Sequence, residues 1–170
     1  MEYRRYICLN DHWESVLADG GVMDSWQDAL RKAWTAVRIP HNWEDYHGYH
    51  RVSHGNLHGS AWYRRELDFD PQWRGKRISL LFEGVGSYAE VWVNRHLVGG
   101  HKGGRTCFRL DITPFLQEGR NLLRVRAWHP EKIMDLPWVC GGCFGTPNTE
   151  GSQPLGIFRP VSLLDPAILT

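Results

Sequence analysis

Apolar side chains recur at every second position through the middle of the chain. Over residues 78–99 they fall first at Ile78, Leu80 and Phe82, and then at Ala89, Val91 and Val93. A period of two is that of a β-strand with one buried face. Asn94-Arg95 follows the second run, and Asn tolerates the positive φ of a two-residue turn. The pattern therefore predicts two antiparallel strands, a tight turn and a short third strand over His96–Val98.

Similar alternation predicts strands on both sides of this stretch. They are expected at Tyr3–Leu9, Ser15–Ala18, Ala61–Phe69, Thr106–Leu110, Asn121–Trp128 and Gly156–Leu164, with a flexible turn at Gly99–Gly104. Residues 24–37 are the one stretch that favours a helix, with Asp24 or Ser25 as N-cap, and the pattern does not fix where it ends. Two long loops are expected, at about 39–60 and 130–154.

Roughly eight to ten short strands joined by hairpins are typical of an all-β domain. The chain has 170 residues, enough for one domain with a substantial core. We therefore expect a single domain over residues 1–170, folded as a jelly-roll β-sandwich.

Residues 84–89 match the dinucleotide-binding fingerprint G-x-G-x-x-A and follow a predicted strand. The fingerprint needs a helix directly after it, because the helix N-terminus holds the pyrophosphate. The next residues, AEVWVN, alternate like a strand instead. We therefore reject a dinucleotide site and expect Gly84 and Gly86 to allow a sharp turn between strands.

The bulk composition excludes several classes of function. The formal net charge is +1 and no basic run occurs, so no nucleic-acid partner is expected. No apolar run is long enough for a membrane span, so no membrane partner is expected. The N-terminal residues MEYRRYICLNDHW lack the apolar core of a signal peptide. We favour a periplasmic or secreted parent over a cytoplasmic one, with its signal peptide absent from this chain.

Tryptophan is unusually frequent, at 9 residues, and glycine reaches 18. Glycines suit the turns and bulges of an all-β sandwich, and flat aromatic rings suit proteins that handle sugars. Most of the tryptophans are nevertheless expected to fill the core.

Metal and redox functions have only incomplete signatures. Cys140 and Cys143 have metal-ligand spacing, but the second pair of ligands that a structural zinc site needs is missing. His54 and His58 are four residues apart, yet Gly55 and Asn56 between them disfavour a helix. We expect no metal site and no cofactor. The four cysteines, Cys8, Cys107, Cys140 and Cys143, are expected to be free thiols.

Six stretches then match a known family in order and spacing. They are IPHNW at 39–43, AWYRREL at 61–67, FEGVGSYAEVWVNRHLVGGHKGG at 82–104, FRLDITPFL at 108–116, NLLRVRAWHP at 121–130 and GIFRPVSLL at 156–164. Together they cover nearly the whole chain. The chain resembles the N-terminal sugar-binding domain of family 2 glycoside hydrolases, the group of β-galactosidases, β-glucuronidases and β-mannosidases.

That resemblance implies a galactose-binding-like jelly roll within a larger retaining glycoside hydrolase. It implies an immunoglobulin-like domain and a catalytic TIM barrel after Thr170, with both catalytic glutamates in the barrel. No catalytic residue is therefore expected in this chain. The residues themselves agree, because Glu66, Asp68, Glu83 and Glu90 fall on strand faces and not as a framed carboxylate pair.

The resemblance also implies a substrate contact from the second long loop. In related β-galactosidases an acidic residue at a similar distance before the GIFR-like strand bonds substrate hydroxyls, and here that residue is Glu150, where the family has Asp. Asn148 and Gln153 are further hydroxyl partners. Trp43 and Trp138 are the expected aromatic contacts, and Trp43 is also expected to lie close to the core.

Three functions remain open at this point. The domain can be an accessory domain that closes one side of the sugar pocket of its parent enzyme. It can be a freestanding carbohydrate-binding module that stacks Trp43, Tyr46, Tyr49 and Trp138 on sugar rings. It can also be a structural support for the barrel. Carbohydrate is the expected partner in the first two.

Overall fold

The computed structural model describes residues 3–18, 26–43, 59–129 and 155–167. Within them the chain forms ten strands, one short α-helix and two 3-10 helices. The strands are β1 (Tyr3–Cys8), β2 (Trp13–Leu17), β3 (Thr35–Val37), β4 (Gly59–Asp68), β5 (Ser79–Phe82), β6 (Tyr88–Val93), β7 (His96–Lys102), β8 (Phe108–Asp111), β9 (Arg120–His129) and β10 (Val161–Ala167). The helices are α1 (Trp26–Ala29), η1 (Pro71–Trp73) and η2 (Thr113–Phe115).

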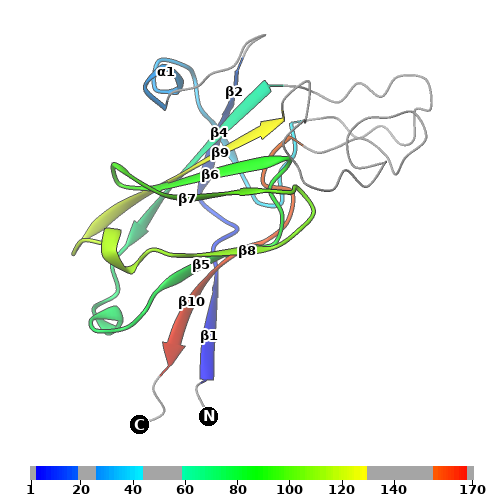
Figure 1. Ribbon diagram of the computed structural model, residues 1–170. Coiled ribbons are helices and arrows are strands. Elements are labelled where there is room, and N and C mark those ends of the chain that lie inside the picture. The colour runs from blue at the N-terminus through cyan, green and yellow to red at the C-terminus, as the bar shows by residue number, and fades with distance from the viewer. Residues whose placement is uncertain (1–2, 19–25, 44–58, 130–154, 168–170) are drawn as a thin grey trace.

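The strands form two antiparallel sheets (Figure 1). The small sheet has the order β1-β10-β5-β8, and the large sheet has the order β3-β2-β4-β9-β6-β7. The longest pairing joins β4 to β9 over ten residue pairs, from Gly59 with His129 to Asp68 with Arg120. The fold is an all-β sandwich, as the alternation of apolar residues predicts.

The core fills the space between the two sheets. From the large sheet it takes alternate residues such as Tyr63 of β4, Val91 of β6 and Val125 of β9, and from the small sheet it takes Leu80 and Leu163. All five side chains are fully buried. The alternate apolar residues of these strands therefore point into the core, as the sequence predicts.

A second, smaller apolar cluster covers the outer face of the large sheet. Trp62 projects from β4 on the side opposite to Tyr63 and packs against Val16, Ala29, Trp34 and Trp92. The rings of Trp62 and Trp92 lie 5.1 Å apart. Helix α1 and the residues after it thus cover one end of this face (Figure 1), which explains why even outward-pointing Trp62 is only 1% exposed.

The predicted helix over residues 24–37 is wrong in its extent. Helix α1 spans only Trp26–Ala29, and Thr35–Val37 is strand β3, which pairs with β2. Trp34 donates its indole N–H to the carbonyl of Ala29, 3.1 Å away, and thereby occupies a C-terminal carbonyl of the helix. Thr35 and Val37 are β-branched, so both favour the strand that follows.

The predicted end of the third strand is also wrong. Strand β7 runs to Lys102, through Gly99 and Gly100, which were assigned to a flexible turn. A Cβ on Gly100 would lie 2.7 Å from the carbonyl oxygen of Ala89, and one on Gly99 would lie 3.0 Å from Leu110. These glycines therefore permit close packing within the sandwich.

Two other expectations from this region are confirmed. Asn94 and Arg95 form the two-residue turn between β6 and β7, and Asn94 has a φ of 56°. Strand β6, not a helix, follows the glycine fingerprint at residues 84–89. The last strand, predicted at residues 156–164, instead spans Val161–Ala167. Residues 155–157, which precede it, are hydrogen-bonded to residues 41–43.

Candidate functional site

Two segments far apart in the sequence are hydrogen-bonded at one end of the sandwich. The amide of His41 donates to the carbonyl of Ile157 at 2.8 Å, and the amide of Trp43 donates to that of Leu155 at 3.0 Å. The side-chain oxygen of Asn42 accepts from the amide of Leu155 at 2.9 Å. We call residues 41–43 and 155–157 together the loop platform.

The loop platform is where both long intervening segments join the described chain. Residues 44–58 run from Trp43 to Gly59, and residues 130–154 run from His129 to Leu155. Gly59 and His129 face each other as the terminal pair of strands β4 and β9. All four junctions therefore gather at one end of the large sheet (Figure 1).

A polar network fastens the platform to the sheet. His41 Nδ1 lies 2.8 Å from the hydroxyl of Tyr63, which also bonds Ser15 and the backbone of Ile157. The indole N–H of Trp43 donates to Ser15 Oγ at 2.8 Å, and Ser15 in turn donates to the carbonyl of Trp62 at 3.0 Å. Ser15 and Tyr63 are fully buried, so each polar atom in this chain of contacts is held by a partner away from water.

Gly156 lets the two segments approach this closely. Its φ is 152°, and a Cβ there would lie 2.4 Å from the hydroxyl of Tyr63 and 2.6 Å from the carbonyl oxygen of His41. The amide of Gly86 donates to the carbonyl of Gly156 at 3.0 Å. Glycine is therefore required at position 156 both by space and by backbone conformation.

The electrostatics of the platform favour neutral groups. Burial lowers the pKa of His41, so its imidazole is neutral at physiological pH. Burial raises the pKa of Tyr63, against the smaller opposing effects of its bonds to Ser15 and Ile157. The neutral His41 and the protonated Tyr63 share a hydrogen bond, and this bond positions residue 41 against strand β4.

Of the residues predicted to contact substrate, Trp43 lies within the described chain. It is half-buried and packs against the core, as predicted, with its ring 5.3 Å from that of His41 in an edge-on arrangement. Glu150, Asn148, Gln153 and Trp138 lie outside the described residues, as do Tyr46 and Tyr49. Their roles as substrate contacts remain predictions.

Other predicted sites have a plain structural outcome. Cys8 and Cys107 are free and exposed thiols, while Cys140 and Cys143 lie outside the described chain. Among the described residues, no group of three His, Cys, Asp or Glu side chains is placed to hold a metal ion. Within those same ranges, no helix has the length and apolar character needed to cross a membrane.

Ser15, His41 and Tyr63 were not predicted as parts of a site. Alternation along β4 puts Tyr63 on the inward face, which identifies it as a core residue but not as a hydrogen-bonding partner. The contact between IPHNW and GIFR is non-local, and nothing in either stretch alone indicates it.

Comparison with known proteins identifies the domain. The family model described as "Glycosyl hydrolases family 2, sugar binding domain" matches residues 7–166. The chain belongs to this family. The stretches IPHNW and GIFR each contribute residues to the loop platform, 41–43 and 156–157.

Relatives of this sugar-binding domain are parts of much longer enzymes. A β-glucuronidase of Bacteroides fragilis is 32% identical over 162 residues, which are 95% of this chain and 21% of that protein. The solved structure of a Bacteroides uniformis β-glucuronidase has a TM-score of 0.71 at 29% identity, over 96% of this chain and 18% of the other. The solved structure of a Bacteroides vulgatus β-glycosidase has a TM-score of 0.67 at 30% identity, over 95% of this chain and 20% of the other.

Replacing Trp43 tests the anchoring of the platform. Trp43→Ala is expected to lower the free energy of unfolding by about 2–3 kcal/mol, somewhat below the value for a fully buried Trp because the ring is half-exposed. Trp43→Phe keeps a smaller aromatic ring and removes the bond to Ser15, so a loss of at least about 0.5–1.5 kcal/mol, and less than that of Trp43→Ala, is expected. Urea unfolding of both variants measures the two values. Equal stability of Trp43→Ala and the native chain would contradict the anchoring role.

The lowered pKa of His41 predicts a pH dependence of stability. In the unfolded chain His41 takes up a proton below about pH 6.5, whereas in the folded chain it does so only at lower pH. The contribution of His41 to the free energy of unfolding is therefore fully present above about pH 6.5, and it falls as the pH drops below that value. His41→Gln should flatten the decrease of Tm between pH 7.5 and 5.5.

His101, whose pKa burial also lowers against a smaller opposing effect of Gly103, adds a decrease of the same sign. Identical slopes in the native chain and His41→Gln would contradict the assignment of a buried neutral imidazole.

Proposed function

We propose that this chain is the N-terminal accessory domain of a family 2 glycoside hydrolase and that it shapes one side of the sugar pocket of a catalytic barrel. The observation that carries the proposal is the loop platform. The 15-residue segment 44–58 starts on this platform and the 25-residue segment 130–154 ends on it, while their other ends are the paired residues Gly59 and His129. A rigid base of this kind is what precise loops need.

Catalysis is assigned to another part of the parent enzyme. Retaining glycosidases need two carboxyl groups about 5 Å apart on either side of the scissile bond. Several described carboxylates are instead engaged with cations on strand faces: Glu14 with Arg64, Glu66 with Arg120, Glu90 with Arg126, Asp111 with Arg77 and Asp165 with Lys76. An immunoglobulin-like domain and a TIM barrel are the proposed partners of the domain within the parent protein.

Substrate contact is assigned to the segment 130–154. Glu150 is the proposed hydroxyl partner, because a carboxylate accepts two hydroxyl hydrogen bonds and charge-assisted bonds are the stronger kind. Asn148 supplies a second polar contact, and Trp138 and Trp43 supply aromatic surface. Trp43 belongs to the loop platform itself, where its indole N–H bonds Ser15 and its ring packs beside His41.

A freestanding carbohydrate-binding module is the alternative. It predicts that the isolated chain binds glycans through aromatic rings, whereas the accessory role predicts a contribution only when the barrel is present. A glycan array that is restricted to neutral sugars and uses the 170-residue chain separates the two. A purely structural support predicts that loop substitutions leave the kinetics of the parent enzyme unchanged.

Kinetics of the parent enzyme test the accessory role. Glu150→Gln should leave Tm unchanged and raise the barrier measured by kcat/KM by about 1.5–3 kcal/mol, the range for a hydrogen bond to a charged group. Glu118→Gln, in the turn before β9 at the opposite end of the sheet, is the matched control and should keep native kinetics. Native kinetics in Glu150→Gln, with native kinetics after removal of Trp138 as well, would leave only the structural role.

A further inference from the structure

A small basic pocket lies at the end of the large sheet opposite to the loop platform. Its volume is about 310 Å³, and it is lined by Asn94, Arg95, His96, Gln117, Leu122 and Arg124. We call it the Arg95 pocket. The turn between β6 and β7 forms one wall, and the start of β9 forms the other. Because Gly59 and His129 mark the platform end of β4 and β9, the pocket and the platform occupy opposite ends of the sheet.

The lining of the pocket consists of hydrogen-bond donors and one apolar side chain. Arg95 and His96 are exposed, Arg124 is half-buried, and Leu122 supplies apolar surface. Neither Asp nor Glu is among the described residues that line it. A pocket of this volume is at the small end of the range for ligand sites, and it is large enough for one sugar ring.

Two arginines lie opposite each other on neighbouring strands beside this pocket. Arg64 of β4 and Arg124 of β9 are direct cross-strand partners, and like charges in such a position destabilise a sheet. Burial and then the charges of Arg64 and Arg95 lower the pKa of Arg124. An anion bound here would be attracted by the guanidinium groups of Arg95 and Arg124.

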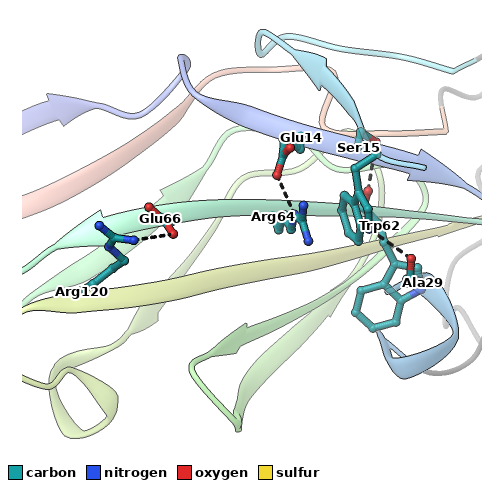
Figure 2. Close-up of polar contacts among 8 residues, drawn as sticks. Glu14, Ser15, Ala29, Trp62, Arg64, Glu66 and Arg120 are labelled. Atoms are coloured by element: carbon teal, nitrogen blue, oxygen red, sulfur yellow. Dashed lines mark hydrogen bonds and ion pairs between the residues drawn. The ribbon is translucent and has the colours of Figure 1, made fainter. Parts of the chain in front are cut away.

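Three carboxylates near this pocket form ion pairs with arginines outside its lining. Glu14 contacts Arg64 at 2.6 Å, and Glu66 contacts Arg120 at 3.2 Å, with both pairs lying along β4 (Figure 2). Glu90 of β6 contacts Arg126 at 3.3 Å. These pairs flank the Arg95 pocket without entering its lining.

The pocket is held in shape by Asn94. Its side chain accepts a hydrogen bond from the amide of Leu122 at 3.0 Å and donates to the carbonyl of Phe115 at 3.0 Å and to the side chain of Asn121 at 2.9 Å. Its backbone carbonyl accepts from the guanidinium of Arg124. The two arginines are therefore presented from a fixed turn and a fixed strand, which lowers the entropic cost of binding.

We propose that the Arg95 pocket binds the carboxylate of an acidic sugar, with Arg95 and Arg124 as the charged contacts. The inference rests on the proposed function, which makes carbohydrate the partner of the domain. The guanidinium group matches a carboxylate in planar, paired hydrogen bonds, and Leu122 offers the apolar surface against which a sugar ring can lie.

The test is an NMR titration of the 170-residue chain with sodium glucuronate, using glucose as the neutral sugar of matched size and inorganic phosphate as a plain anion. Glucuronate should shift the amide signals of residues 94–96, 117 and 122–124. Glucose should not shift them, and phosphate should bind at least about tenfold more weakly, since it lacks the ring. Arg95→Gln should weaken glucuronate binding at least about tenfold, the loss of one charge-assisted bond, while Arg109→Gln on the small sheet should leave it unchanged.

Several outcomes would overturn the assignment. They are equal shifts with glucose, equal affinity for phosphate and glucuronate, unchanged affinity in Arg95→Gln, or no binding at all. None of them changes the result expected for the kinetics of Glu150→Gln in the parent enzyme. Native kinetics in Glu150→Gln would likewise not change the result expected from this titration. The two proposals therefore fail separately.

Discussion

The close approach of Gly156 to the hydroxyl of Tyr63 is the constraint on which the loop platform depends. A methyl group at position 156 would overlap both that hydroxyl and the carbonyl of His41. Glycine permits the main chain of 155–157 to pair with that of 41–43, and the pairing then fixes where segment 44–58 starts and where segment 130–154 ends. The polar network behind it is buried and shared, so its members stabilise one another and a single loss leaves others without partners.

The tryptophans of the chain divide between the two sides of the large sheet. Trp13 is buried in the core between the sheets, with its indole N–H bonded to the carbonyl of Leu9. Trp62, Trp34 and Trp92 form the outer cluster, where the guanidinium of Arg64 lies 4.4 Å above the ring of Trp34. The outer face is thus a second packed layer of rings and ion pairs, and its positive excess gathers at the turn that carries Arg95.

The sequence predicts the local features of this fold well and its long-range contacts poorly. Strands β5, β6 and β9 follow from alternation, because one buried face imposes a period of two on the residues that form it. The turn at Asn94 follows from the tolerance of Asn for positive φ. The helix over 24–37 was predicted too long because good helix formers outnumber Thr35 and Val37, whereas pairing with β2 decides the outcome.

Gly99, Gly100 and Gly156 show the limit most clearly. The sequence assigns Gly99 and Gly100 to a turn and Gly156 to the start of a strand, and in the structure all three are places where neighbouring atoms leave little room for a Cβ. Which atoms crowd them depends on residues far away in the chain, so no window of local sequence contains the answer. The same holds for Ser15 and Tyr63, whose partners lie 28 and 22 residues away.

The most direct test of the account is native-state hydrogen exchange of the 170-residue chain and its Gly156→Ala variant. Exchange reports local opening separately from global unfolding. The account predicts that the amides of His41, Trp43 and Leu155 lose protection in the variant while those of Val91 and Val125 in the large sheet keep most of theirs. Native protection at His41 and Trp43 in Gly156→Ala would show that the platform does not depend on this close approach, and would contradict the account.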